Sequence, residues 1–298
     1  MSTLSAQHGS SLKQVSPGRK IKDRVIQGLV YAAFLLAVIP LVSVLWTVIS
    51  HGIKSLNATF LTHSMNAVLP TDKGGGLYHA IIGTLEQVAL AAAMAVPLGL
   101  MSAIYLVEYA QGGRLSRAVS FFVDVMTGIP SIVAGLFVLA FWQLGLGFGF
   151  SGFAGSMALA ILMVPTVVRT TEEMLKLVPH DLREAAAALG VPRWRTISFV
   201  VIPTALTGII SGVMLGIARI MGETAPLLVT IFITNAINTD PFNGAQGSLP
   251  TFIWDQSTNP SQNAVDRAWG GALVLILIIM LLNLVARLIA WLRKPATR

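Results

Sequence analysis

The chain has 298 residues, of which 54% are hydrophobic and 11% are charged, and its mean hydropathy is +0.74. A soluble domain of this size cannot cover so much apolar surface with polar residues, so the composition excludes a soluble globular protein and indicates a lipid bilayer. The formal net charge of +7 would suggest nucleic acid binding in a soluble protein. Here the basic residues lie beside apolar segments, so they indicate membrane topology and no nucleic acid partner is expected. The absence of cysteine excludes thiol catalysis, disulfides and cysteine-ligated metal sites.

Residues 1–24 are polar and basic, and we expect them to form a flexible tail. The apolar segment that follows is longer than that of a signal peptide and predicts a retained membrane helix. Five more apolar segments come after it, each near the about 20 residues that a helix needs to cross hydrocarbon. The sequence therefore predicts an all-α polytopic protein with one membrane domain over residues 25–293. The six predicted transmembrane helices are residues 25–49, 80–106, 118–142, 152–168, 205–234 and 269–291.

The distribution of Lys and Arg predicts the orientation of these helices. Of the 20 Lys and Arg residues, 16 fall on the side that holds both termini, three fall on the opposite side, and Arg219 lies inside a span. Because cytoplasmic loops carry the excess of basic residues, we expect both termini to be cytoplasmic.

Proline falls within five of the six predicted spans. Each proline removes a backbone hydrogen bond and can kink its helix. Neighbouring helices in a bundle can compensate for the lost bond, so ordinary packing is one interpretation. At Pro226 the freed carbonyl belongs to Gly222, beside Glu223 and one turn from Arg219. A free backbone carbonyl, an acidic side chain and a basic side chain at one depth of the membrane indicate a substrate pathway. The other four prolines are Pro40, Pro97, Pro130 and Pro165.

Ionisable groups inside a membrane are costly and are therefore candidate functional residues. Arg219 is predicted near the middle of the fifth span, with Glu223 four residues later on the same helix face. The two side chains can neutralise each other. Alternatively, the planar guanidinium of Arg219 can bind a passing phosphate, whose oxygens it matches, while Glu223 moderates the attraction.

Other charged or polar residues carry weaker signals. Arg169, at the predicted end of the fourth span with Glu172 and Glu173 one turn later, either extends to the interface or lines the exit of the pathway. We expect Glu86 and Asp124 to be hydrogen-bonded inside the bundle and assign them no role. His79 is predicted to be a loop histidine at the outer interface.

The loop between the fourth and fifth predicted spans, within residues 169–204, is long and amphipathic. Asp181 follows Pro179, where the first turn of a helix favours an acidic residue. The alanines after Glu184 favour continuation of this helix, and Gly190 can adopt the left-handed conformation that ends it. A second short helix is predicted from Pro192 to about Phe199, and Pro203 is predicted to mark the start of the fifth span.

This loop resembles the EAA signature of permeases of ABC importers, through Glu184, Ala185, Ala186, Gly190, Val200, Ile202 and Pro203. Val200 and Ile202 stand where the pattern usually has isoleucine and leucine, and both keep an apolar contact. The resemblance implies a type I ABC importer permease fold and a coupling helix that docks into a cytoplasmic ATPase. An ordinary interfacial helix is the alternative. The residues that the resemblance assigns to ATPase coupling are Asp181, Arg183, Glu184, Ala185, Ala186 and Gly190.

Three further segments, residues 128–136, 169–173 and 219–228, resemble the PstA-type permeases of phosphate importers, and the resemblance covers most of residues 77–290. It implies translocation of phosphate along a path with Arg219, Glu223 and Arg169, in the plasma (inner) membrane. It also implies a homologous PstC-like permease, a PstB-like ATPase dimer and a PstS-like binding protein as partners. The chain itself is expected to bind no cofactor, with ATP and Mg held by the ATPase subunits.

Other function classes remain as alternatives. A permease for sulfate, molybdate or phosphonate would share the architecture and the coupling loop. An ATP-independent carrier or channel would commonly show an inverted repeat, and none is evident. A membrane enzyme is disfavoured because no nucleophile elbow or zinc-binding histidine pair surrounds Ser131, Ser151 or His79. The chain also lacks a G-x-x-x-x-G-K-[ST] phosphate loop, so we do not expect it to be the ATPase.

Overall fold

The computed structural model describes residues 17–110 and 112–292. The chain forms two compact units, residues 1–49 and 50–298, which are described separately. The first contains most of helix α1 (Pro17–Gly52), which is uninterrupted at Pro40. Because α1 begins at Pro17, residues 17–24 of the expected tail are helical; the rest of that tail, and the basic residues after 292, lie outside the described residues.

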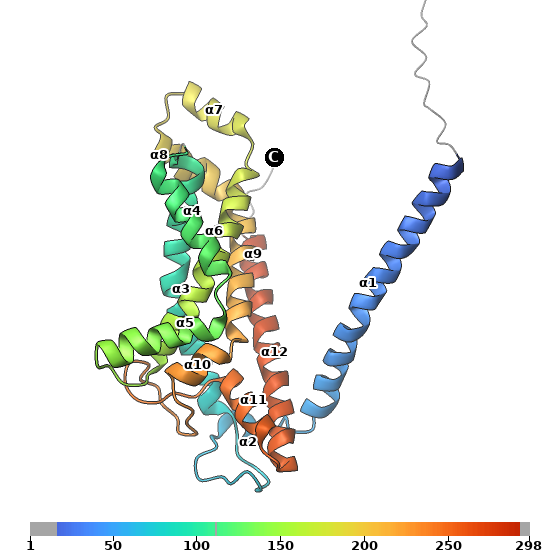
Figure 1. Ribbon diagram of the computed structural model, residues 1–298, viewed down its shortest axis with the longest axis vertical. Helices are drawn as coiled ribbons and strands as arrows, with labels where there is room; N and C mark the ends of the chain where they lie inside the picture. Colours follow the sequence, from blue (N-terminus) through green and yellow to red (C-terminus); the bar gives the residue numbers. More distant parts are fainter. Residues whose placement is uncertain (1–16, 111, 293–298) are drawn as a thin grey trace, which may run out of the picture. The chain divides into compact units, whose positions relative to one another are not determined.

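The described part of the second unit is a bundle of helices that includes three π-helical segments, labelled η. In Figure 1, α7 and α8 lie at one extremity of this unit, the α7 end, and α2 and α11 lie at the other, the α11 end. The elements are α2 (Ala58–Thr62), α3 (Tyr78–Ile104), η1 (Tyr105–Tyr109), α4 (Arg114–Thr127), α5 (Ser131–Val138), η2 (Leu139–Gly145), α6 (Gly152–Lys176), α7 (His180–Ala188), α8 (Arg193–Thr196), η3 (Ile197–Val201), α9 (Ile202–Met221), α10 (Ala225–Thr230), α11 (Leu249–Thr258) and α12 (Gln262–Leu292).

Among the described residues, five helices are long and apolar enough to cross a membrane, and the number is six if the bent pair α4 and α5–η2 forms one span. The all-α polytopic fold is thus confirmed. The prediction of one continuous helix over residues 118–142 is wrong, because α4 and α5–η2 meet at 106°. Proline disfavours helical conformation at the residue before it, so Ile129 leaves the helix after the Gly128 cap, and Pro130 is the residue that caps the start of α5.

The fifth predicted span, residues 205–234, is wrong at both ends. One helix runs from Arg193 to Met221 through α8, η3 and α9, so Pro203 lies within it and does not mark its start. In η3 the N–H of Ile202 bonds to the carbonyl of Ile197, and this wider turn accommodates a proline that lacks an N–H. The helix then ends at Met221, and Pro226 lies in the first turn of the separate helix α10.

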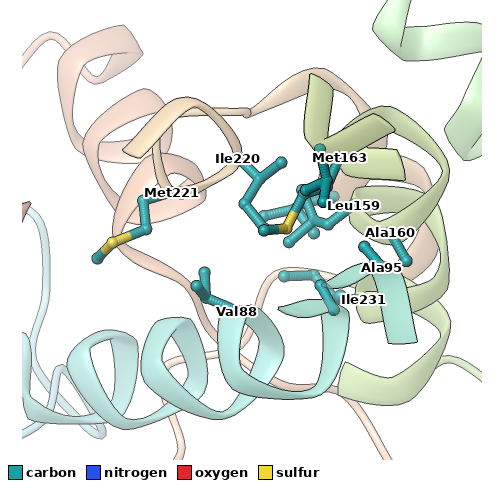
Figure 2. Close-up of a cluster of buried hydrophobic side chains, with 11 residues drawn as sticks. Val88, Ala95, Leu159, Ala160, Met163, Ile220, Met221 and Ile231 are labelled. Carbon is teal, nitrogen blue, oxygen red and sulfur yellow. The ribbon is translucent and has the colours of Figure 1, made fainter. Parts of the chain in front are cut away.

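Helix α6 lies at the centre of the bundle and packs against α3 and α9. Figure 2 shows the buried apolar cluster between them, in which Ile220 of α9 lies close to Met163 of α6. Gly208, Gly212 and Gly216 of α9 contact Met174, Thr170 and Met163 of α6, respectively. Small residues every four positions allow two membrane helices to approach closely, so this stripe sets the spacing of α6 and α9.

The α11 end is held together by buried polar groups. Arg267 of α12 is only 4% exposed; its guanidinium donates to the Gln256 side chain and to the carbonyls of Pro70, Asp72 and Gly74. These bonds tie the segment before α3 to α11 and α12. His79 is 2% exposed and packs edge-on against Phe252, so the prediction that it is a loop histidine is wrong. The apolar packing of α3 against α11 buries it.

Candidate coupling and substrate-path sites

The short helix predicted around Glu184 exists as α7 at the α7 end of the bundle (Figure 1). Pro179 caps its start in an extended conformation, and Asp181 lies in the first turn. Gly190 has φ of +72°, and the N–H groups of Gly190 and Val191 bond to the carbonyls of Ala187 and Ala186 at 2.9 and 3.0 Å. The predicted helix and its left-handed glycine termination are therefore confirmed.

An ion pair anchors α7 to the bundle. Arg183 Nη2 and Nε donate to Glu108 Oε1 of η1 at 2.7 and 3.2 Å. The same guanidinium donates to the carbonyls of Val178 at 2.6 Å and Leu175 at 2.9 Å. The side chains of Arg183 and Glu108 are 18% and 7% exposed, so Arg183 faces the bundle. It positions α7 rather than presenting a free charge on its outer surface.

An apolar groove of about 730 Å³ lies between α7 and the start of the α8–η3–α9 helix. Leu189, Trp194 and Phe199 line it and are 83%, 54% and 71% exposed. Ala186 is buried at the groove, whereas Asp181, Glu184 and Ala185 are exposed. The loop thus presents an apolar surface with acidic neighbours, which is suited to binding another protein chain.

Arg219 and Glu223 lie where α9 breaks. Arg219 is in the last turn of α9, not near the middle of a span, and Glu223 follows the helix end. Their closest charged atoms, Nε and Oε1, are 3.9 Å apart, beyond hydrogen-bond distance. The Arg219 side chain is 50% exposed. Its guanidinium is therefore loosely paired and accessible to an anion.

A second helix break lies at the level of the first. A Cβ on Gly135 of α5 would lie 2.6 Å from Pro226 Cα of α10, and Gln143 of η2 donates to the Thr230 carbonyl at 2.7 Å. These two contacts show that α5–η2 and α10 run side by side in the same direction. The start of α5 therefore lies at the level of the turn after Met221. Broken helices are tolerated inside membranes where their backbone is buried in protein or lines a cavity.

Arg169 lies inside α6 and is neutralised by carboxylates. It pairs with Asp124 of α4 and with Glu172 at 2.7 Å, and Glu172 also pairs with Lys176 at 2.6 Å. Its neighbour Thr170 packs on Gly212 of α9. Gly212 precedes Arg219 by seven residues, which is roughly 10 Å along the axis of α9 at the rise of an α-helix. Arg169 and Arg219 thus lie at different levels of the bundle.

Sequence reasoning missed several residues that these sites use. Glu108, which ends an apolar run, could have been found as an isolated carboxylate at a helix end. Asp124 and Glu86 are hydrogen-bonded, as expected, to Arg169 and to Gln246 Nε2 (2.6 Å) respectively, but Asp124 is 65% exposed. Gln246 carried no signal, because its neighbours in the fold are about 160 residues away in the chain.

Comparisons with known proteins show the family to which this chain belongs. A family model described as binding-protein-dependent transport system inner membrane component matches residues 95–298. A phosphate transport system permease protein, PstA 1 of Mycobacterium tuberculosis, is 50% identical over 281 residues, covering 94% of this chain and 91% of the relative. PstA of Mycobacterium leprae is 48% identical, covering 92% and 90%, and PstA of Pasteurella multocida is 39% identical, covering 91% and 95%.

Solved structures show the same fold at low sequence identity. A chain of the inward-facing MetNI methionine ABC transporter superposes with a TM-score of 0.60 at 21% identity, covering 74% of this chain and 98% of that one. A chain of a bacterial ABC transporter that imports alginate gives 0.58 at 17% identity, covering 90% and 98%. The fold is thus that of ABC importer permeases, and the chain belongs to the family of inner membrane components of binding-protein-dependent transport systems.

Proposed function

We propose that this chain is the permease subunit of an ATP-driven importer that moves inorganic phosphate into the cytoplasm. The observation that carries the proposal is the half-exposed Arg219, held loosely by Glu223 where α9 breaks. Relatives up to 50% identical are named phosphate transport permeases, which supports phosphate over sulfate, molybdate or phosphonate as the substrate.

Arg219 suits a transient phosphate site for two reasons. Its planar guanidinium matches two phosphate oxygens, and it stays charged in any environment a substrate path offers. Glu223, 3.9 Å away, offsets part of the positive charge without occupying every donor. A transported anion must be attracted and then released, so a partly neutralised arginine fits the task better than an isolated one.

Energy would come from other subunits. In this proposal α7 docks into a PstB-like ATPase dimer, with Glu184, Ala185 and the apolar groove as the contact surface, and Arg183 holds α7 against the bundle. A PstC-like permease completes the pore, and a PstS-like protein delivers phosphate at the α11 end. The α7 end and both termini are then cytoplasmic, as the excess of Lys and Arg favours. ATP and Mg bind to the partner subunits and the chain itself carries no cofactor.

Phosphate uptake in cells that lack this permease and express variants from a plasmid tests the proposal. Arg219→Gln should abolish uptake while the complex still assembles, because the anion loses the guanidinium contact proposed at the break. The matched control is Arg117→Gln, a surface arginine of α4, which should transport normally. Excess unlabelled sulfate, molybdate or phosphonate should not compete. Normal uptake by the Arg219→Gln variant would contradict the phosphate path, and strong competition by another oxyanion would reassign the substrate.

A further inference from the structure

A second cavity, of about 460 Å³, lies at the start of α7 and is separate from the apolar groove. We call it the basic cavity. Residues 106–108, at the end of the second span, form one wall, and the last residue of α6 and the first residues of α7 and α8 form the others. Its basic lining residues are Lys176, His180, Arg183 and Arg193.

Lys176 and Arg193 are less engaged by protein acceptors than Arg183. Arg183 uses four of its five N–H donors on Glu108 and on two backbone carbonyls. Lys176 has one carboxylate contact, with Glu172 at 2.6 Å, which leaves two of its three N–H donors. Arg193 lies 5.5 Å from the ring centre of Tyr109 and has no carboxylate partner within residues 17–110 and 112–292. Since Glu108 is the sole acidic lining residue and Arg183 neutralises it, the cavity has a net positive charge.

The backbone adds to this positive potential. The nine-residue helix α7 begins at the cavity, and its cap residue Pro179 makes no side-chain hydrogen bond to the first turn. The N–H groups of that turn therefore have no intrahelical acceptor and no side-chain cap. Asp181, the acidic residue of the same turn, is not part of the lining. A helix start with free N–H groups and flanking cations is a favourable place for a phosphate group.

We propose that the basic cavity binds a phosphate group, contributed either by free inorganic phosphate or by the headgroup of an anionic lipid. Lys176 and Arg193 contact its oxygens, and the start of α7 completes the site. The ligand bridges α6, α7 and α8, so its binding restrains the segment between residues 178 and 196. Because no part of the site overlaps Arg219, the site is independent of the proposed substrate path. Arginine and lysine both favour phosphate oxygens, arginine through two parallel hydrogen bonds.

The test is hydrogen–deuterium exchange of residues 178–196 in the assembled importer, in nanodiscs. One arm uses pure phosphatidylcholine and titrates inorganic phosphate against sodium chloride of equal ionic strength. The other omits phosphate and replaces a third of the lipid with phosphatidylglycerol. We expect slower exchange in at least one arm, and the arm that responds identifies the source. Neither arm slowing exchange would overturn the proposal.

Variants show whether the cavity is responsible. The double variant Lys176→Gln, Arg193→Gln should remove the protection from exchange. Each single variant should raise the ligand concentration needed for half-maximal protection about tenfold, which is the effect of one lost charge-assisted hydrogen bond. Arg193→Lys, which keeps the charge, should retain most of it, so loss in Arg193→Gln is not a folding defect. Arg219→Gln should respond as the unmodified protein does. Protection that survives in the double variant, or that is lost in Arg219→Gln alone, would overturn the proposal.

Discussion

Arg183 of α7 and Glu108 of η1 form a salt bridge of 2.7 Å between two largely buried side chains 75 residues apart in the chain. This pair joins the loop outside the bundle to the end of the second span. The donors of this one guanidinium make four hydrogen bonds, which connect α7 to the ends of α3–η1 and α6. The structure thereby gives the proposed coupling helix a direct connection to the spans.

Removing either partner should leave a buried charge unpaired. Arg183→Ala is expected to destabilise the assembled permease by about 3 kcal/mol and to reduce phosphate uptake per ATP hydrolysed. Thermal unfolding and parallel ATPase and uptake assays measure this. Arg117→Ala, an exposed arginine in α4, is the control and should change unfolding by less than about 0.5 kcal/mol. Equal unfolding temperatures of the two variants would contradict the anchoring role of Arg183.

Gly190 is predicted to be sensitive to backbone conformation alone. Its φ is +72°, and a Cβ added there would meet no atom within 4 Å. Gly190→Ala should therefore cost about 1 kcal/mol through left-handed strain without any clash. Gly190→Asn should cost less, because asparagine tolerates this conformation. Exchange rates of α7 amides measure the difference, and equal rates in the two variants would refute the explanation.

Gly135 is predicted to be a position where adding a single methyl group forces two broken helices apart. A Cβ there would lie 2.6 and 2.8 Å from Pro226 Cα and O, which are backbone atoms that cannot rotate away. Gly135→Ala should destabilise the protein by about 1–3 kcal/mol and reduce uptake. Gly149→Ala, where nothing lies within 4 Å, should behave as the unmodified protein in the same melting and uptake assays. A stable, active Gly135→Ala variant would show that α5 and α10 do not need this contact.

Arg169 can be a structural link, a path residue, or both, and paired variants separate these roles. Asp124 is 65% exposed, so Asp124→Asn should cost at most about 1 kcal/mol and leave uptake nearly unchanged. Arg169→Gln removes the charge itself and, if the exit assignment is correct, should reduce uptake several-fold at similar stability. Uptake at saturating phosphate compares the two. Equal uptake in both variants would leave Arg169 with only its link between α4 and α6.

The sequence determined the features that local chemistry sets. Apolar runs of span length determined the membrane fold, since no polar shell could cover them. The sequence around Asp181, the alanines and Gly190 determined helix α7, because acidic first turns, helix propensity and left-handed glycine are properties of consecutive residues. The identity of Arg219 and Glu223 as neighbours at i and i+4 also follows from the sequence.

Tertiary structure decided how the helices on either side of a break are arranged and which charges meet. Hydropathy cannot distinguish one span of residues 118–142 from two helices at 106°, because both contain the same apolar residues. The packing of Gly135 on Pro226 stabilises the second arrangement. The partners of Arg183 and Arg169, namely Glu108 and Asp124, are 75 and 45 residues away in the chain. Such pairings depend on how helices assemble in three dimensions, and no local pattern in the sequence specifies them.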